Sequence, residues 1–315
     1  WDDLSLFISY GMLSDEKFYE RAQKFALLKN TDNKYFTFDE YKKLIQDNQT
    51  DKNKSLIYLY ATKIDDQYSF IESAKAKGYD VLLMEGHLDT HLVSHLEQKF
   101  ENSRFVRVDS DVVDKLILKE DTQETKLSAA EQLVLKNVLV GPLPNKENFD
   151  VDFASMNEND VPLVITQSEF TRRMKDMSTL GGGMNFYGNL PDRFSLVVNT
   201  NNSLITRTLD DVTKAHEKDL KGFSEKLDSL EEHKKDLQKA QEGKKDEEIK
   251  QEEKDKLSNV ETKIKEIEDK RKTLLEDYGK KNDLICQLTD LALLSNNMLK
   301  GENLTKFVKR SIDLI

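Results

Sequence analysis

The sequence predicts a multi-domain chain of the α plus α/β class. We expect a helical segment, a small parallel-sheet αβα subdomain, and an α+β C-terminal domain with an inserted antiparallel coiled-coil hairpin. Three observations predict this fold. Residues 56–108 read as strand, helix, strand, helix, strand, which is typical of parallel strands joined by crossover helices. Residues 213–282 are dense in charge and carry apolar residues at heptad spacing. The length of 315 residues exceeds what a single core usually organises.

Composition limits the kinds of partner. Charged residues make up 34% of the chain and the net charge is -11, which argues against nucleic acid or an anionic membrane as the main partner. No apolar run approaches the roughly 20 residues that span a bilayer. The single cysteine, Cys286, allows no internal disulfide and fits a reducing cytoplasm, so we expect a cytoplasmic protein. Cys286 lies in an apolar helical run, which favours a small buried side chain over a catalytic thiol.

Residues 1–50 are predicted to be helical. Trp1, Leu4 and Ile8 follow helical spacing from the first residue, so we expect the natural protein to be longer at this end. A later helix should begin at Thr37, because Thr37 and Glu40 fit the capping-box pattern.

Residues 51–120 form the predicted α/β subdomain. Its strands are expected at residues 56–60, 81–84 and 105–108, with helices at 68–77 and 88–100. Gly78 should end the first of these helices. Residues 109–126 are polar and acid-rich, so we interpret them as a linker and domain boundary.

Residues 121–315 form the predicted C-terminal domain. It should begin with a helix at 127–139 and continue with strands at 150–156, 163–166 and 194–198. A short helix at 168–180 and a loop with three consecutive glycines, 181–183, should separate the last two strands.

The charged stretch at 213–282 is predicted to be a helical hairpin. Two sets of apolar residues are each spaced 3, 4, 3, 7 on either side of a polar break at 242–245: Leu220, Phe223, Leu227, Leu230 and Leu237, then Leu257, Val260, Ile264, Ile267 and Leu274. We expect this hairpin to be an appendage that can be removed from about residue 214 to 280 without loss of the fold.

Residues 283–315 are predicted to be two dimerisation helices. Their apolar stripes are Leu284, Leu288, Leu291 and Leu294 on the first helix and Leu304, Phe307, Val308 and Ile312 on the second. Two such helix pairs would pack into a four-helix interface, so the sequence predicts a homodimer.

Two patterns could indicate catalytic chemistry. His87, His91 and His95 recur every fourth residue, and two His one turn apart can chelate zinc. Three collinear His cannot all reach one ion, however, so a solvated helix shoulder is favoured over a metal-dependent enzyme. The three glycines at 181–183 lack the Lys-Ser/Thr of a phosphate loop, which favours a plain loop.

The short helix at 168–180 places Phe170, Met174 and Met177 on one face. A buried core stripe is one interpretation. The other is an exposed, adaptable patch, because Met-rich surfaces suit the binding of many partners.

Two groups of residues resemble a known family. In the α/β subdomain they are Phe70-Ile71-Glu72, Lys77-Gly78-Tyr79-Asp80-Val81, Met84-Glu85 and Leu96-Glu97-Gln98-Lys99-Phe100, and in the last helices Asp290-Leu291-Ala292-Leu293-Leu294-Ser295 followed by residues 303–315. With these motifs the chain resembles the ninety-kilodalton heat-shock chaperones of the bacterial type, over nearly its whole length apart from the charged hairpin.

The resemblance implies a function. It makes this chain the client-binding and homodimerising part of an ATP-dependent chaperone that assists protein folding. Residues 1–50 would be the helical end of the middle domain of that family, and residues 51–120 its small α/β subdomain. Client contacts would fall on Phe170, Met174 and Met177, and on Thr90, His91 and Ser94. ATP and Mg would bind an N-terminal domain of the longer protein, so this chain itself would carry no cofactor and no enzymatic activity. A structural coiled-coil scaffold is the alternative from another class.

Overall fold

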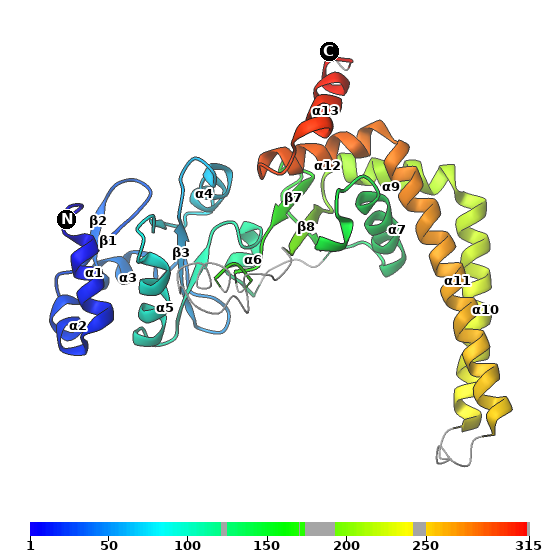
Figure 1. Ribbon diagram of the computed structural model, residues 1–315, viewed down its shortest axis with the longest axis horizontal. Helices are drawn as coiled ribbons and strands as arrows, with labels where there is room; N and C mark the ends of the chain where they lie inside the picture. The colour runs from blue at the N-terminus through cyan, green and yellow to red at the C-terminus, as the bar shows by residue number, and fades with distance from the viewer. Residues whose placement is uncertain (121–124, 170, 174–192, 242–249, 314–315) are drawn as a thin grey trace. The chain divides into compact units, whose positions relative to one another are not determined.

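The computed structural model describes residues 1–120, 125–169, 171–173, 193–241 and 250–313 (Figure 1). The chain divides into two compact units. Unit 1 comprises Trp1–Glu124, Glu147–Met156 and Val164–Val197, and unit 2 comprises Thr125–Lys146, Asn157–Leu163 and Val198–Ile315. The predicted domain boundaries near residues 50 and 120 stay predictions.

Unit 1 begins with helices α1 (Ser5–Ser14) and α2 (Glu16–Ala22), and α3 (Phe38–Ile45) follows later. The capping box at Thr37 and Glu40 is present. The expectation of helices alone is wrong, because β1 (Leu27–Lys29) and β2 (Tyr35–Thr37) form an antiparallel pair. Asn30 makes the connecting turn: its Oδ1 accepts hydrogen bonds from the backbone N–H groups of Asp32 and Lys34 at 3.1 and 3.0 Å. Strands of three residues are too short to show a period of two in the sequence.

The predicted parallel sheet is confirmed. Strands β3 (Leu56–Ala61), β4 (Val81–Leu83) and β5 (Ser103–Arg107) alternate with α4 (Tyr68–Ala76) and α5 (Asp89–Lys99). The strand order is β4-β3-β5, and both pairings are parallel. Every residue of β3 is buried, as expected for a central strand that is covered on both faces. The order leaves β5 at one edge of this sheet.

Residues 109–126 are not a simple linker, which corrects the sequence interpretation. They include helix α6 (Val113–Leu116). Val113, Leu116 and Ile117 belong to a core with Ile57 and Leu59 of β3. The acidic residues around these side chains conceal a short apolar pattern in the sequence.

A further three-stranded sheet contains β6 (Phe149–Ala154), β7 (Leu163–Thr166) and β8 (Phe194–Asn199) in the order β6-β8-β7. A single 3-10 turn, η1 (Lys146–Asn148), precedes β6. These strands match the predicted ranges to within a few residues, so the mixed helix-and-sheet composition is as predicted.

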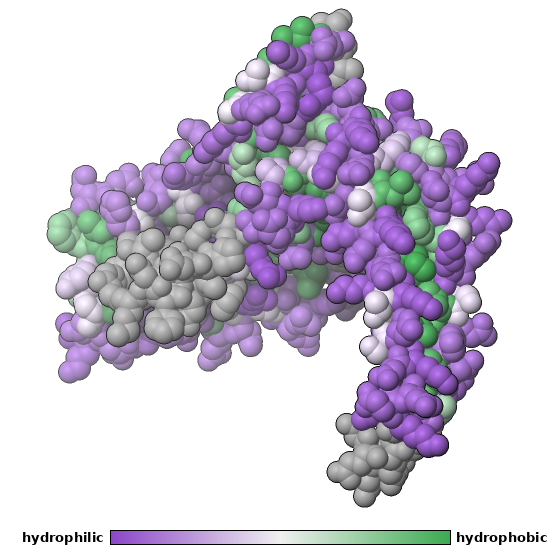
Figure 2. Space-filling model, turned by 45° about the vertical axis from the view of Figure 1, so that its right-hand side comes forward, coloured by the Kyte–Doolittle hydropathy of each residue, from purple (hydrophilic) through white to green (hydrophobic). Residues whose placement is uncertain are grey.

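The remaining described elements of unit 2 are helices: α7 (Ala129–Val140), α9 (Ser203–Ala215), α10 (Glu217–Gln241), α11 (Gln251–Lys281), α12 (Asp283–Ser295) and α13 (Gly301–Asp313). Figure 1 shows α10 and α11 side by side over their length. Leu227 and Val260 are buried between them, and Lys234 Nζ lies 2.9 Å from Glu261 Oε1. Figure 2 shows apolar residues in a line between hydrophilic ones along these two helices.

The base of α11 is part of the core of unit 2, so the expectation that the whole hairpin is an appendage is wrong. Leu275 and Glu276 are buried, and α11 packs directly on α7. Two glycines bring the backbones together. A Cβ atom added to Gly279 would lie 2.0 Å from the carbonyl oxygen of Val138, and one added to Gly141 would lie 2.3 Å from that of Glu276. The Glu276 carboxylate also pairs with Lys146 at 2.5 Å.

Among the described residues, none of the helices combines the length and the apolar character that crossing a membrane requires.

Candidate protein-binding surfaces

The first candidate surface lies on α5. Thr90, His91 and Ser94 are half-buried on this helix, and the Ser94 hydroxyl donates a hydrogen bond to the Thr90 carbonyl at 3.1 Å. Leu92, Val93 and Leu96 form the opposite, buried face. Packing of that face holds α5 against the sheet. The three candidate side chains therefore lie on the partly exposed side of the helix.

The predicted face of three histidines does not exist. Helix α5 begins at Asp89, so His87 precedes the helix and is not stacked with the other two. His95 instead packs its ring edge-on against Tyr19 with centroids 5.1 Å apart, and burial lowers the pKa of the His95 imidazole, as does the nearby Lys99 ammonium. No group of three or more metal-ligating side chains gathers in the part of the chain that the structure describes.

The second candidate surface begins at Glu169. Phe170, Met174 and Met177 lie outside the described residues, and so does the glycine loop at 181–183. The structure does describe Glu169, Thr171, Arg172 and Arg173, all of them helical.

Charged side chains hold this first helical turn against the α/β subdomain. Arg173 pairs with Glu97 of α5 and with Glu169, each at 2.6 Å. Arg172 also reaches Glu169 at 2.6 Å, and the Tyr60 hydroxyl donates to the Glu169 carboxylate at 2.6 Å. We call Glu97, Glu169 and Arg173 the ionic clamp.

The electrostatics of the clamp favour its charged form. Burial disfavours ionisation of Glu169, but Arg172, the Tyr60 hydroxyl and Arg173 together outweigh it and hold the pKa of this carboxyl below its ordinary value. Burial and the neighbouring Glu169 carboxylate raise the pKa of Tyr60 to about 12. At neutral pH, Glu169 is therefore an anion that accepts from several donors.

The predicted dimerisation residues fall into two groups. Leu288 and Phe307 are buried within the chain, and Leu284 and Leu304 are half-buried. The other four side chains are exposed, with 44% of Leu291, 39% of Leu294, 45% of Val308 and 64% of Ile312 accessible to solvent. Gln287 Nε2 donates to Ser311 Oγ at 2.9 Å, and Arg310 pairs with Asp290, which fixes α13 against α12. In the described part of the chain, α12 and α13 thus each keep two large apolar side chains exposed, and we call these four residues the apolar stripe.

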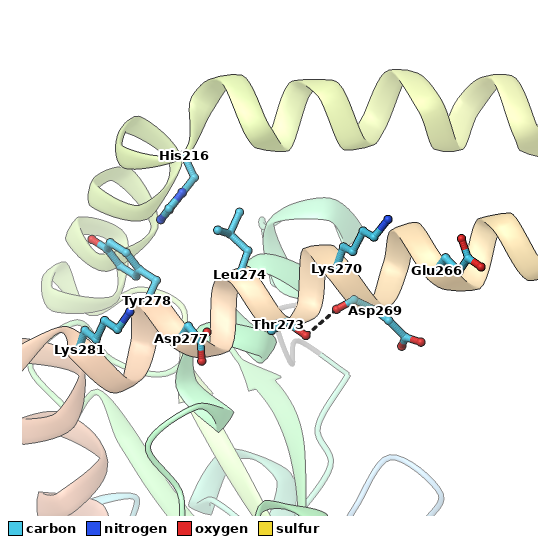
Figure 3. Close-up of a pocket in the computed structure, with 9 residues that line it drawn as sticks. All are labelled: His216, Glu266, Asp269, Lys270, Thr273, Leu274, Asp277, Tyr278 and Lys281. Atoms are coloured by element: carbon cyan, nitrogen blue, oxygen red, sulfur yellow. Dashed lines mark hydrogen bonds between the residues drawn. The ribbon is translucent and has the colours of Figure 1, made fainter.

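A groove lies beside α11, at the junction of α9 and α10. It measures about 750 Å³ and includes His216, Leu274 and Tyr278 in its lining. Figure 3 shows the His216 ring pointing toward the Tyr278 ring, and their centroids are 5.4 Å apart. Both acidic and basic side chains of α11 line the groove, among them Asp269, Lys270 and Asp277. The mixed charge of this lining favours no single class of ligand.

The ionic clamp leaves little trace in the sequence pattern. Its three members belong to α5 and to a segment some 70 residues later, and a single sequence gives no sign that such distant charges meet. One local signal was present. Glu169, Arg172 and Arg173 have the i, i+3 and i, i+4 spacing of helical ion pairs.

Comparison with known proteins identifies the family. The family model described as "Hsp90 protein" matches residues 1–221. The chain is 50% identical over 317 residues to "Chaperone protein htpG" of Bacteroides fragilis strain YCH46. It is 49% identical to "Chaperone protein HtpG" of Bacteroides thetaiotaomicron and 44% identical to the protein of that name from Porphyromonas gingivalis strain W83. Each alignment covers 100% of this chain and 46% of the relative, so the chain spans about half the length of these relatives. As the sequence motifs predicted, the chain belongs to the Hsp90 family of chaperones.

Proposed function

We propose that this chain is the client-binding and homodimerising part of a cytoplasmic chaperone that assists protein folding. The observation that carries the proposal is the exposed apolar stripe formed by Leu291 and Leu294 of α12 and Val308 and Ile312 of α13. Large apolar side chains gathered on the surface of a soluble chain mark interaction sites. The family membership supports a chaperone role, whereas no observation favours the scaffold alternative.

The first part of the proposal is a homodimer through this stripe. Replacing Leu291 by Asp places a charge in the apolar contact and should convert dimers to monomers in sedimentation equilibrium at micromolar concentration. Leu291 is exposed within one chain, so the variant should keep the circular dichroism spectrum of the wild type and should still unfold cooperatively in urea. Lys309→Asp, at another exposed position of α13, serves as the control and should stay dimeric. A monomeric wild type at high micromolar concentration, or a dimeric Leu291→Asp variant, would contradict the placement.

The second part is the binding of partly unfolded clients at Phe170, Met174 and Met177, with Thr90, His91 and Ser94 as a second contact. The combined change of Phe170, Met174 and Met177 to Ser should weaken suppression of client aggregation. If this face is exposed, stability should change by no more than about 0.5 kcal/mol per position. If the face is core, large-to-small changes should each cost about 2–5 kcal/mol, and a urea titration separates the two cases. Unchanged aggregation suppression in the triple variant would exclude these residues as client contacts.

The coiled-coil character of the α10–α11 pair is also a proposal. Its support is the heptad spacing of the apolar residues and the burial of Leu227 and Val260 between the helices.

We place ATP and Mg binding in a part of the longer protein outside this chain. The sequence has no phosphate-binding loop that pairs glycines with a Lys-Ser/Thr. Isothermal titration of this chain with ATP and Mg should give no saturable heat, and a micromolar site would refute the assignment.

A further inference from the structure

Among the residues that the structure describes, side chains and not another strand cover the outer edge of β5. Strand β5 lies at the edge of the β4-β3-β5 sheet and pairs with β3 in parallel register. The Asn102 carbonyl accepts from Leu56 N–H at 2.8 Å, and Val108 N–H donates to the Tyr60 carbonyl at 2.9 Å. Backbone groups alternate sides along a strand. The even-numbered residues therefore face β3, and the polar backbone groups of Phe105 and Arg107 face away from it.

The ionic clamp satisfies these outward groups in order. Phe105 N–H donates to Glu97 Oε1 at 2.7 Å. The Phe105 carbonyl accepts from Arg173 Nη2 at 2.6 Å. Arg107 N–H donates to Glu169 Oε2 at 3.3 Å. The clamp thus presents acceptor, donor and acceptor to three consecutive main-chain groups.

An added strand would present the same sequence of groups. A neighbouring strand offers carbonyl, N–H and carbonyl along about 6.6–6.8 Å, the rise of two residues, and it would pair with the three groups now held by the clamp. Strand addition of this kind is a common way to bind an extended peptide, because the edge reads the backbone and leaves the side chains free to vary. We infer that the β5 edge is a strand-addition site for an extended polypeptide segment, and that Glu97, Arg173 and Glu169 occupy it as a side-chain cap.

The cap has a second consequence for the free protein. An uncovered edge strand is a template for unwanted pairing with other chains, and charged groups that occupy its hydrogen bonds prevent this. A client backbone must therefore compete with the clamp for the backbone groups of β5. The stability of the clamp then determines how tightly the edge binds a client. This inference rests on the proposed client-binding function and adds a backbone-reading contact to it.

Removing Arg173 tests the inference. The probe is a fluorescein-labelled acetyl-(Val-Thr)₃-amide peptide, whose binding is followed by fluorescence anisotropy. Arg173→Ala deletes the central donor and the bridge between the two carboxylates, so the peptide should bind at least about tenfold more tightly than it binds the wild type, the equivalent of about one or two net hydrogen bonds. Glu97→Gln keeps an acceptor at the strand edge while weakening the ion pair, and it should give a smaller gain.

Two controls separate strand addition from other effects. A peptide that is N-methylated at every residue has no amide N–H to donate along either edge, and it should show no gain with Arg173→Ala. Arg207→Ala, which breaks an exposed ion pair with Asp211, should bind the probe as the wild type does. Equal binding of both peptides to Arg173→Ala, or no gain in either clamp variant, would overturn the inference. Self-association of Arg173→Ala without peptide would also overturn it, because the occupant would then be a second copy.

Amide hydrogen exchange provides a readout that needs no client. In Glu97→Gln the Phe105 and Arg107 amides should exchange faster than in the wild type, and the peptide should restore their protection. If peptide binding leaves these two amides unprotected, it occurs elsewhere and the inference fails. Failure of the proposed function would be seen separately, as a wild type that does not suppress client aggregation.

Discussion

At the scale of single residues, Glu169 shows how one carboxylate can join parts of the chain that are distant in sequence. It accepts from Tyr60 of β3, from the backbone of Arg107 in β5, and from two arginines of its own helical turn. A buried carboxylate with this many donors is stabilised in its ionised form.

The lowered pKa of Glu169 predicts a dependence of stability on pH. Because its pKa is below the ordinary 4.5 in the folded chain, the stability gained from its ionisation is fully present above pH 4.5 and is lost as the pH falls through the folded value. The loss of unfolding free energy caused by Glu169→Gln should therefore shrink as the pH falls below 4.5. Urea unfolding of both proteins on either side of this pH measures the difference.

Glu302→Gln is the matched control for this measurement. Glu302 pairs with Lys306 at 2.8 Å on the exposed surface of α13, where an ion pair contributes little. Its replacement should change stability only slightly at any pH. A Glu169→Gln difference that is constant from pH 7 to pH 3 would contradict the assignment of an ionised Glu169.

At the scale of elements, the close crossing of α7 and α11 depends on two glycines, Gly141 and Gly279, which have no side chain. Gly279→Ala would drive a Cβ atom to 2.0 Å from the Val138 carbonyl oxygen, so the helices must move apart. Overpacking of this kind typically costs about 1–3 kcal/mol, and we expect the free energy of unfolding measured in urea to fall by that amount.

Gly222→Ala in α10 is the control, because an added Cβ meets nothing within 4 Å there. That change should stabilise the chain by about 0.5–1 kcal/mol through helix propensity. Equal effects of the two changes would show that the contact at Gly279 is unimportant.

The same elements show what a sequence can predict. The parallel sheet was predictable because its strands are continuous apolar runs and its helices have regular spacing. The β1–β2 pair was missed because each strand has only three residues. Helix α6 was missed because its apolar residues, Val113 and Leu116, lie among acidic residues that make the whole stretch read as polar. The close crossing at Gly141 and Gly279 depends on contacts between segments far apart in sequence, which a local pattern does not encode.

At the scale of the whole chain, the paired helices α10 and α11 divide into a removable end and a fixed base. Gln241 bonds the Glu253 carbonyl at 3.2 Å and Lys234 pairs with Glu261, which sets the register of the two helices. Replacing residues 231–264 by a short turn should lower helicity but leave cooperative urea unfolding. Removing residues 214–280 should abolish it, because the base packs on α7. Circular dichroism with urea titration distinguishes these outcomes, and cooperative unfolding of the longer deletion would show that the base is dispensable.

The contact between α7 and the base of α11 also bears on synthesis of the chain. Gly141 leaves the ribosome roughly 140 residues before Gly279, a delay of about 7–30 s at 5–20 residues per second. During that interval the face of α7 that carries Val138 has no α11 to pack against. A protein of a chaperone family thus passes through a stage in which its own nascent helix offers the kind of uncovered surface that chaperones bind.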